Sequence, residues 1–164
     1  MPKEIFVEWE GPLSYDEAIK YYFDNESRSD YGLYQIYGPH PIYSNKKRKS
    51  DDDILLYIGQ TTSGGKFSER IKSQGFCNGP GYKIYFGRID PEHKIDDNIW
   101  RLYVLDAEKI LINKYTPPYN AQYVGDLTNN QLNIQDSVII NLGKDIGDLD
   151  KEVRSEEVVY TSTS

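Results

Sequence analysis

Cysteine is nearly absent from this chain of 164 residues, since Cys77 is the only one. A single thiol excludes a disulfide within the chain, which fits a reducing compartment. Long apolar segments are missing too, because no run of about 18 apolar residues occurs. The amino terminus also lacks a basic stretch followed by an apolar one. We therefore expect a soluble, cytoplasmic protein with no membrane partner.

An excess of positive charge is lacking as well, because the net charge is −7. The charge is unevenly placed. Residues 1–30 and residues 126–164 each carry three basic and eight acidic side chains, whereas residues 31–125 carry thirteen basic and ten acidic ones. Since electrostatic fields reach only about 8–10 Å in physiological salt, local charge decides whether phosphate groups bind. The acidic flanks oppose tight non-specific binding to nucleic acid but leave a basic central surface open.

The length fits one domain large enough to fold without disulfides. Composition divides the chain into an amino-terminal extension packed on the core (1–30), a central domain (31–123) and an acidic, polar, partly disordered tail (124–164). The tail has one short apolar run at residues 138–140. We expect a mixed α/β fold of the α+β type.

Several elements follow from local patterns. Residues 4–9 alternate as in a strand, and Ser14 with Glu17 forms a capping box that starts a helix. Strands are expected at 31–37, 54–59 and 82–89, and helices at 67–74 and 97–114. Gly75 is placed to end the first of these helices, and Pro117 with Pro118 prevents continuation of the second. Residues 38–53 form a solvated loop with a basic run followed by an acidic one.

Four candidate catalytic residues lie on these expected strands and helices. Tyr34 and Tyr57 lie in neighbouring expected strands, each close to a glycine that allows close approach of a ligand or backbone. Arg70 lies on the short helix. Glu108 lies midway along the long helix, with apolar residues three and four positions away on both sides. A carboxylate in such surroundings is costly to bury, and a bound cation would remove that cost.

These residues resemble the GIY-YIG nuclease family in order and element type. The segments are Gly32-Leu33-Tyr34, then Tyr57-Ile58-Gly59-Gln60-Thr61, then Arg70, then Glu108 followed by Pro118-Tyr119-Asn120. The resemblance covers about residues 31–120 and implies a three-stranded antiparallel sheet flanked by helices. It implies that Glu108 binds one divalent cation, Mg²⁺ or Mn²⁺, and that Arg70 contacts the scissile phosphate. By the same resemblance Tyr34 and Tyr57 position or activate the attacking water, and Asn120 orders the site.

Two features depart from the family pattern. Many members carry a histidine four residues after the arginine, where this chain has Gln74, which cannot titrate. The loop 38–53 lengthens the spacing between the two tyrosines. Such an insertion between strands is tolerable. Lys66 is a second candidate for catalysis, and the candidate nucleic-acid contacts are Lys46, Lys47, Arg48, Lys49 and Lys72.

The residues and the resemblance together predict a divalent-metal-dependent DNA endonuclease of the restriction, phage or mobile-element kind. A homodimer would suit cleavage of both strands at a palindrome. One alternative is a catalytically silent module that binds nucleic acid or protein, and another is an inhibitor whose acidic flanks mimic nucleic acid. Taken one at a time, the candidate site residues can also be explained by structural roles without catalysis. The chain has fifteen tyrosines that pack in strands, Glu108 has Arg101 or Lys109 as ion-pair partners, and residues 46–49 form a solvated loop.

Overall fold

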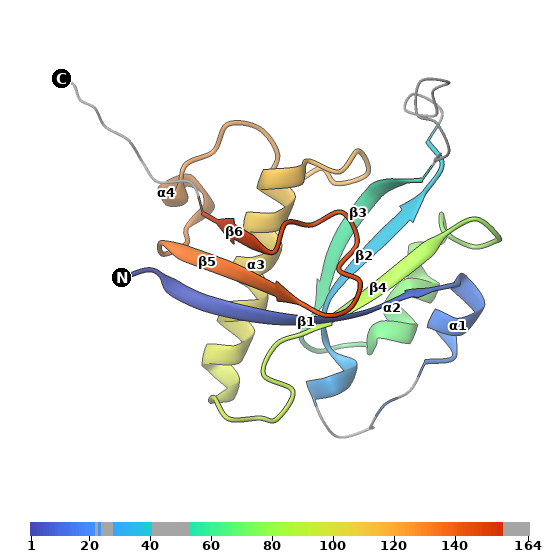
Figure 1. Ribbon diagram of the computed structural model, residues 1–164, viewed down its shortest axis with the longest axis horizontal. Coiled ribbons are helices and arrows are strands. Elements are labelled where there is room, and N and C mark those ends of the chain that lie inside the picture. Colours follow the sequence, from blue (N-terminus) through green and yellow to red (C-terminus); the bar gives the residue numbers. More distant parts are fainter. Residues whose placement is uncertain (22, 24–27, 41–52, 156–164) are drawn as a thin grey trace.

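The protein is a mixed α/β structure built on a single six-stranded sheet (Figure 1). The computed structural model describes residues 1–21, 23, 28–40 and 53–155. In chain order the elements are β1 (Lys3–Leu13), α1 (Tyr15–Ile19), η1 (Arg28–Asp30), β2 (Gly32–Gly38), β3 (Ile54–Thr61), α2 (Phe67–Gln74), β4 (Lys83–Arg88), α3 (Asp97–Tyr115), α4 (Asn129–Leu132), β5 (Ser137–Leu142) and β6 (Glu152–Arg154). No helix in these ranges is long and apolar enough to cross a membrane.

The strand order is β3-β2-β4-β1-β5-β6. The expected three-stranded antiparallel sheet is therefore only one end of the real sheet, because β2 pairs antiparallel with both β3 and β4. The long strand β1 extends this unit. Its second half pairs antiparallel with β4 and its first half pairs parallel with β5. The expectation of three strands was wrong because pairing between distant segments leaves no local pattern in the sequence.

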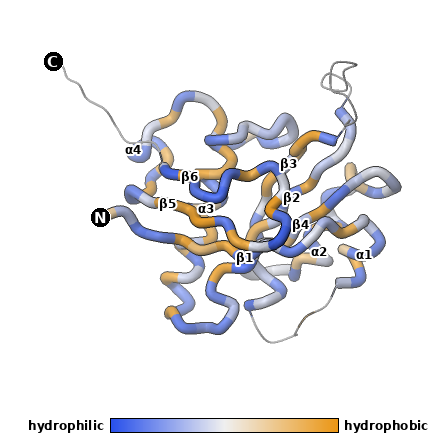
Figure 2. Tube along the Cα trace, in the orientation of Figure 1, coloured by the Kyte–Doolittle hydropathy of each residue, from blue (hydrophilic) through white to orange (hydrophobic). Residues whose placement is uncertain are grey.

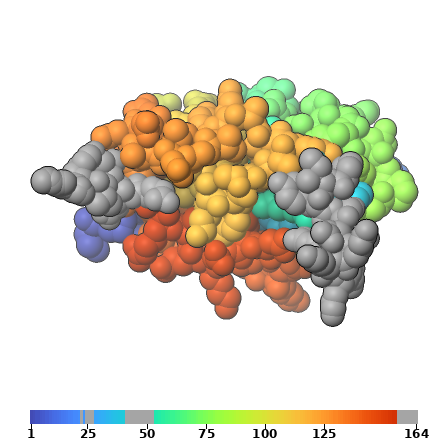
Figure 3. All heavy atoms as spheres, turned by 90° about the horizontal axis from the view of Figure 1, so that it is seen from above, coloured from blue at the N-terminus to red at the C-terminus, as the bar shows by residue number. Residues whose placement is uncertain are grey.

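The segment from residue 124 onward also differs from the expected polar tail. Residues 138–140 lie in β5, where Val138 and Ile139 are buried, and β6 pairs with β5 at the edge of the sheet. Figure 3 shows this segment, in orange to red, as part of the body of the molecule. Asp126, Asp136, Asp145, Asp148 and Asp150 lie in the connections between these elements, so composition alone misses the strands. Residues 156–164 lie outside the described residues.

The two faces of the sheet carry separate apolar cores, and alternation along β2 distributes residues between them. Leu33 and Tyr37 belong to the core that includes α3, whereas Tyr34 and Ile36 belong to the core that includes residues of α1 and α2. Figure 2 shows apolar residues gathered along the strands and hydrophilic ones in the connections. The expected strands and helices of the central segment therefore meet in one framework that presents Tyr34 on the face of α2.

Local signals set the helix ends as expected. Ser14 Oγ accepts a hydrogen bond from the Glu17 amide, and the Glu17 carboxylate accepts one from the Ser14 amide, which completes the capping box. Gly75 ends α2 with a φ of 79°. α3 ends at Tyr115, and the capping residue Thr116 adopts a left-handed conformation just before the two prolines.

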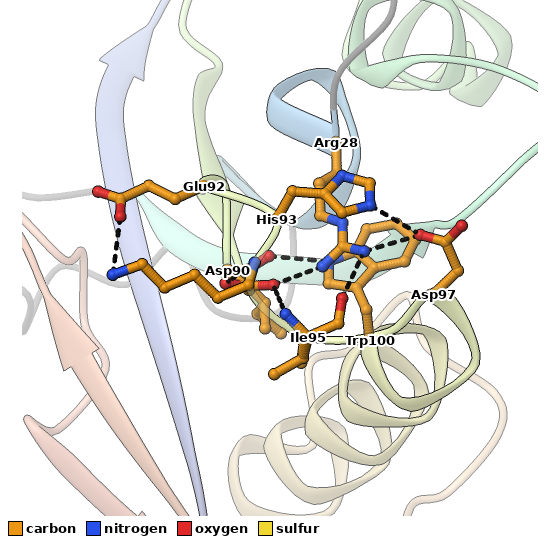
Figure 4. Close-up of polar contacts among 9 residues, drawn as sticks. Arg28, Asp90, Glu92, His93, Ile95, Asp97 and Trp100 are labelled. Carbon is orange, nitrogen blue, oxygen red and sulfur yellow. Dashed lines mark hydrogen bonds and ion pairs between the residues drawn. The ribbon is translucent and has the colours of Figure 1, made fainter.

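A buried arginine ties the amino-terminal segment to the start of α3. Arg28 in η1 donates to Asp90 at 2.5 Å, to Asp97 at 2.7 Å and to the carbonyl oxygen of Ile95 at 2.9 Å. Its guanidinium also lies over the ring of Trp100, 5.0 Å from the centroid. Figure 4 shows these residues converging from η1, the loop before α3 and the first turns of α3. This cluster fixes the loop from which α3, the helix of Glu108, begins.

Candidate active site

Tyr34 and Tyr57 lie side by side on the face of the sheet that carries α2. Tyr34 is opposite Gly59 and Tyr57 is opposite Ile36 in the β2–β3 register, and the two ring centroids are 6.1 Å apart. A side chain at position 59 would collide with the Tyr34 ring and hydroxyl. The glycine beside the second tyrosine thus makes room for the first tyrosine, rather than for a ligand or another backbone.

Arg70 reaches this pair from α2. Its guanidinium is hydrogen-bonded to the Tyr34 hydroxyl and lies close enough to Tyr57 and Glu108 to act on the pKa of both groups. The Arg70 Nε atom is buried and has no hydrogen-bond partner in the structure. Because an unpaired buried donor is costly, a ligand oxygen that reached this atom would satisfy it.

Gln74 lies one helical turn after Arg70 and contacts the same phenols. Its Nε2 donates to the Tyr34 hydroxyl at 2.7 Å, and it also hydrogen-bonds with Tyr57. Sequence reasoning treated Gln74 only as a departure from the family pattern. The structure places it within the site, in direct contact with both tyrosines. Its signal in the sequence is the four-residue spacing from Arg70 on one helix face.

Glu108 enters from α3 and is the carboxylate of the group. Burial raises its pKa from 4.5 to about 7, although Arg70 and Lys109 oppose the shift. No hydrogen bond or ion pair to its carboxylate is found within the described part of the chain. Lys109 instead donates to the carbonyl oxygen of Leu132. The carboxylates of α3 that form close ion pairs are Asp97, with Arg28 at 2.7 Å, and Asp106, with Lys3 at 2.6 Å. The ion-pair reading of Glu108 therefore finds no support here.

Burial also raises the pKa of both phenols. For Tyr34 the burial is complete, and the neighbouring Tyr57 adds to the shift. For Tyr57 the negative charge of Glu108 adds to the effect of burial, while hydrogen bonds and Arg70 oppose it. Both phenols therefore hold their protons at neutral pH and act as hydrogen-bond donors and acceptors.

Asn120 has a clear positional role at the outer edge of β3. Its side-chain oxygen accepts from the Ile58 amide at 3.0 Å, and its side-chain nitrogen donates to the Ile58 carbonyl oxygen at 2.9 Å. The amide of Tyr119 donates to the carbonyl oxygen of Leu56 at 2.9 Å. The turn after α3 thus pairs with β3 on both sides of Tyr57. Asn120 holds the strand of Tyr57 in place and does not itself join the phenols.

The basic candidates are placed less centrally. Lys66 precedes α2, and its amide donates to the Glu69 carboxylate at 2.9 Å. Lys72 is exposed in the last turn of α2. Lys46, Lys47, Arg48 and Lys49 lie outside the described residues. The structure therefore brings Tyr34, Tyr57, Arg70 and Glu108 together with Gln74, and leaves the contribution of the lysines as a prediction.

Comparisons of this chain with protein-family models, with curated proteins and with solved structures find no significant match.

The donors at the site limit which cation it would suit. Across the described ranges, no group of three or more histidine, cysteine or acidic side chains is arranged to hold a metal ion. A cation held by Glu108 alone would keep most of its ligands as water and phosphate oxygen. This fits Mg²⁺, which binds through one or two carboxylates and retains water. The partly buried, unpaired carboxylate of Glu108 is the observation that fits such a cation.

Two of the hollows on the described part of the molecule lie away from this group. One, of about 530 Å³, is lined by Lys3, Tyr103, Asp106, Asn129 and neighbouring residues. The other, of about 390 Å³, lies between β1 and the loop before α3. Neither is lined by the tyrosines, Arg70 or Glu108.

Proposed function

We propose that this protein is a divalent-metal-dependent endonuclease of the GIY-YIG type that hydrolyses DNA phosphodiester bonds. The observation that carries the proposal is the meeting of Tyr34, Tyr57, Arg70 and Glu108. They come from β2, β3, α2 and α3, and they lie close enough to act on one another's pKa. Two phenols, a guanidinium and an unpaired carboxylate form a group suited to a phosphodiester and a cation.

Each side chain has a task that follows from its surroundings. Glu108 would hold the Mg²⁺ or Mn²⁺, and the bound cation supplies Lewis-acid stabilisation of the phosphoryl oxygens. Arg70 would donate to a non-bridging oxygen of the scissile phosphate, because its guanidinium lies close to both Tyr57 and Glu108. Gln74 and Arg70 fix the Tyr34 hydroxyl, so that Tyr34 orients its neighbour Tyr57.

Tyr57, which is only partly buried, would position the attacking water rather than deprotonate it, and the buried Tyr34 would support Tyr57. Their raised pKa values keep both phenols protonated, and a protonated phenol accepts a hydrogen bond from water while donating its own. Glu108, with a pKa of about 7, is the group nearby whose proton can leave near neutral pH. Once Glu108 holds the cation, its carboxylate is not free to act as a base, so proton removal from the attacking water falls to solvent.

The proposed nuclease would also need a way to recognise its DNA site and, for cleavage of both strands, a second subunit. A compact chain of this kind fits a restriction-type or phage-borne nuclease that recognises DNA through loops of its catalytic domain. Cleavage of both strands at a two-fold symmetric site would take a homodimer.

The test is cleavage of supercoiled plasmid in Mg²⁺ or Mn²⁺ by the parent protein, Glu108→Gln and Arg70→Ala. Parent protein should nick the plasmid, EDTA should prevent nicking, and both variants should be at least about 100-fold slower because each removes stabilisation of the phosphoryl charge. The control is Arg154→Met, which changes an arginine in a surface pair with Glu152. A parent protein that leaves plasmid and oligonucleotides intact in every divalent cation refutes the enzymatic proposal.

A second candidate is a catalytically silent module with the same fold that binds nucleic acid or protein. Gln74 favours it, because this side chain replaces a titratable histidine and holds Tyr34 without offering a proton. This candidate predicts binding of nucleic acid that depends on Arg70 but no cleavage in any cation. Equilibrium binding and plasmid nicking by the same preparation distinguish the two.

A further inference from the structure

A row of aromatic rings leads outward from the candidate active site. Tyr57 lies 6.2 Å from Phe76, Phe76 lies 4.8 Å from Tyr119, and Tyr119 lies 5.3 Å from His40, each measured between ring centroids. We call these four residues the aromatic strip. Neighbouring rings meet edge to face or tilted, with interplanar angles of 70°, 86° and 56°.

The strip differs from the aromatic core beneath it. Phe67 and Phe86 stack at 4.3 Å and are fully buried. In the strip, Tyr119 is 40% exposed, and Tyr57, Phe76 and His40 are only partly buried. Partly open rings that adjoin one another form a contiguous apolar surface, and such a surface, unlike single exposed apolar side chains, is a candidate binding site.

Backbone contacts hold the strip in place. The amide of Tyr119 donates to the Leu56 carbonyl oxygen, and Asn120 pairs with Ile58, so Tyr119 is fixed against β3 next to Tyr57. Gly75 turns the chain at the end of α2, and Phe76 follows directly and contacts Tyr57. A surface held by main-chain hydrogen bonds loses little conformational entropy when a ligand binds.

Positive charge accompanies the strip on α2. Arg70 of this helix lies beside Tyr57, and Lys66 directly precedes the helix, four residues before Arg70. Lys72 is exposed two positions after Arg70 and therefore points to another side of the helix. Aromatic faces beside cations match a polymer whose flat apolar groups alternate with phosphates, which is an unpaired nucleic-acid strand. In a duplex the base faces are stacked on one another and cannot reach such rings.

We infer that the aromatic strip stacks on unpaired nucleobases flanking the phosphate bound at Arg70, so that the substrate class is single-stranded or locally unpaired nucleic acid. This inference rests on the proposed function for the role of Arg70. DNA and RNA share the required chemistry, and stacking of this kind is tolerant of base sequence. The strip therefore selects strand state, not a recognised sequence.

The experiment measures binding in EDTA, where no metal-dependent cleavage occurs, to dodecamers with a central 2-aminopurine. The arms are single-stranded DNA, single-stranded RNA and duplex DNA. The parent should bind at least one single strand about tenfold more tightly than duplex, and stacking should quench the 2-aminopurine fluorescence. Tyr119→Leu should lose about tenfold of the single-strand affinity, whereas Tyr119→Phe, which keeps the ring, should retain it. If Tyr119→Leu does not fold, the quenching and the duplex comparison in the parent decide.

Phe6→Leu is the matched control, because Phe6 is an exposed ring on β1 outside the strip. Equal affinity for duplex and single strands, or unchanged single-strand affinity and quenching in Tyr119→Leu, overturns the inference. Plasmid nicking that requires Glu108 without any single-strand preference refutes the strip but leaves the nuclease standing. Single-strand binding without cleavage in any cation supports the aromatic strip but refutes the nuclease activity.

Discussion

At the scale of single residues, burial controls the charge of Glu108. It lies partly buried on α3 without an ion-pair partner, and its pKa is raised to about 7. Near neutral pH the carboxyl therefore divides between a neutral form that suits the buried surroundings and a charged form that suits a cation. A cation must displace that proton in order to bind.

The first prediction concerns stability and pH in the absence of divalent metal. Between pH 4.5 and about 7 the folded protein holds a proton on Glu108 that the unfolded chain has lost. The free energy of unfolding should therefore fall as pH rises through this range, by roughly 2–3 kcal/mol from this group. Glu108→Gln, which stays neutral, should remove this part of the dependence. Urea unfolding in EDTA at pH 5, 6, 7 and 8 measures it, and identical pH profiles for the two proteins would contradict the burial argument.

The second prediction concerns the hydroxyl of Tyr57. Because its pKa is raised, this phenol orients water through hydrogen bonds and cannot be replaced by a bare ring. Tyr57→Phe should lower the rate of phosphodiester cleavage about 100-fold, within the range typical of a positioned polar group, while leaving the affinity for uncleaved DNA unchanged. Tyr85→Phe serves as control, since the Tyr85 hydroxyl donates to Asp145 away from the site. Equal rates for Tyr57→Phe and the parent would exclude Tyr57 from the reaction.

At the scale of elements, the turn after α3 couples the helix of Glu108 to the strand of Tyr57. Asn120 makes two hydrogen bonds to Ile58, one in each direction, as a neighbouring strand would. The third prediction is that Asn120→Ala lowers the free energy of unfolding by about 2 kcal/mol, because two backbone groups lose their partner. Cleavage should also slow, since Tyr57 is next to Ile58.

The matched variant is Asn120→Asp, which keeps the acceptor for the Ile58 amide but loses the donor to its carbonyl oxygen. It should lie between Asn120→Ala and the parent in thermal unfolding. An Asn120→Ala protein with parental stability and activity would show that the turn does not hold β3.

The fourth prediction concerns the start of α3. Arg28 is buried and is the shared partner of Asp90 and Asp97. Arg28→Met should lower the free energy of unfolding by about 3 kcal/mol, because Asp90 is left largely buried without its counter-charge. Arg154→Met, which removes an exposed pair with Glu152, should change stability little. The comparison is made by urea unfolding, and equal losses in both variants would contradict the role assigned to Arg28.

These elements also show what a sequence can predict. The capping box at Ser14, the end of α2 at Gly75 and the stop of α3 before Pro117 are local features, and all three are confirmed. The pairing of β1 with β5 joins segments more than a hundred residues apart and has no local sign. The buried Arg28 has none either, because its partners lie in a distant loop and helix.

The candidate site likewise has some features that the sequence predicts and others that it does not. The residue types and their order suggested Tyr34, Tyr57, Arg70 and Glu108 through the resemblance to a nuclease family, and the structure brings them together. Their spacing alone could not reveal that position 59 requires a glycine because the Tyr34 ring lies against it. The aromatic strip was also out of reach, because its rings come from three separate loops and one strand.

At the scale of the whole molecule, one sheet unites three segments that composition had separated. β1 connects the β3-β2-β4 end, where the candidate site lies, to β5 and β6 at the other end. The two halves share the core that includes α3, with Leu33 and Ile58 from one half and Ile139 and Val153 from the other. The position of Glu108 therefore depends on packing contributed by nearly the full length of the described chain.

The central claim is that Glu108 and Arg70 act as one unit on a phosphodiester. The most direct test is single-turnover cleavage of an oligonucleotide in Mg²⁺ by the parent, Glu108→Gln, Arg70→Ala and the double variant. Residues that act together are non-additive, so the double variant should be no more than about tenfold slower than the slower single variant. Undiminished cleavage by Glu108→Gln, or losses in the double variant that equal the product of the single losses, would contradict a shared site.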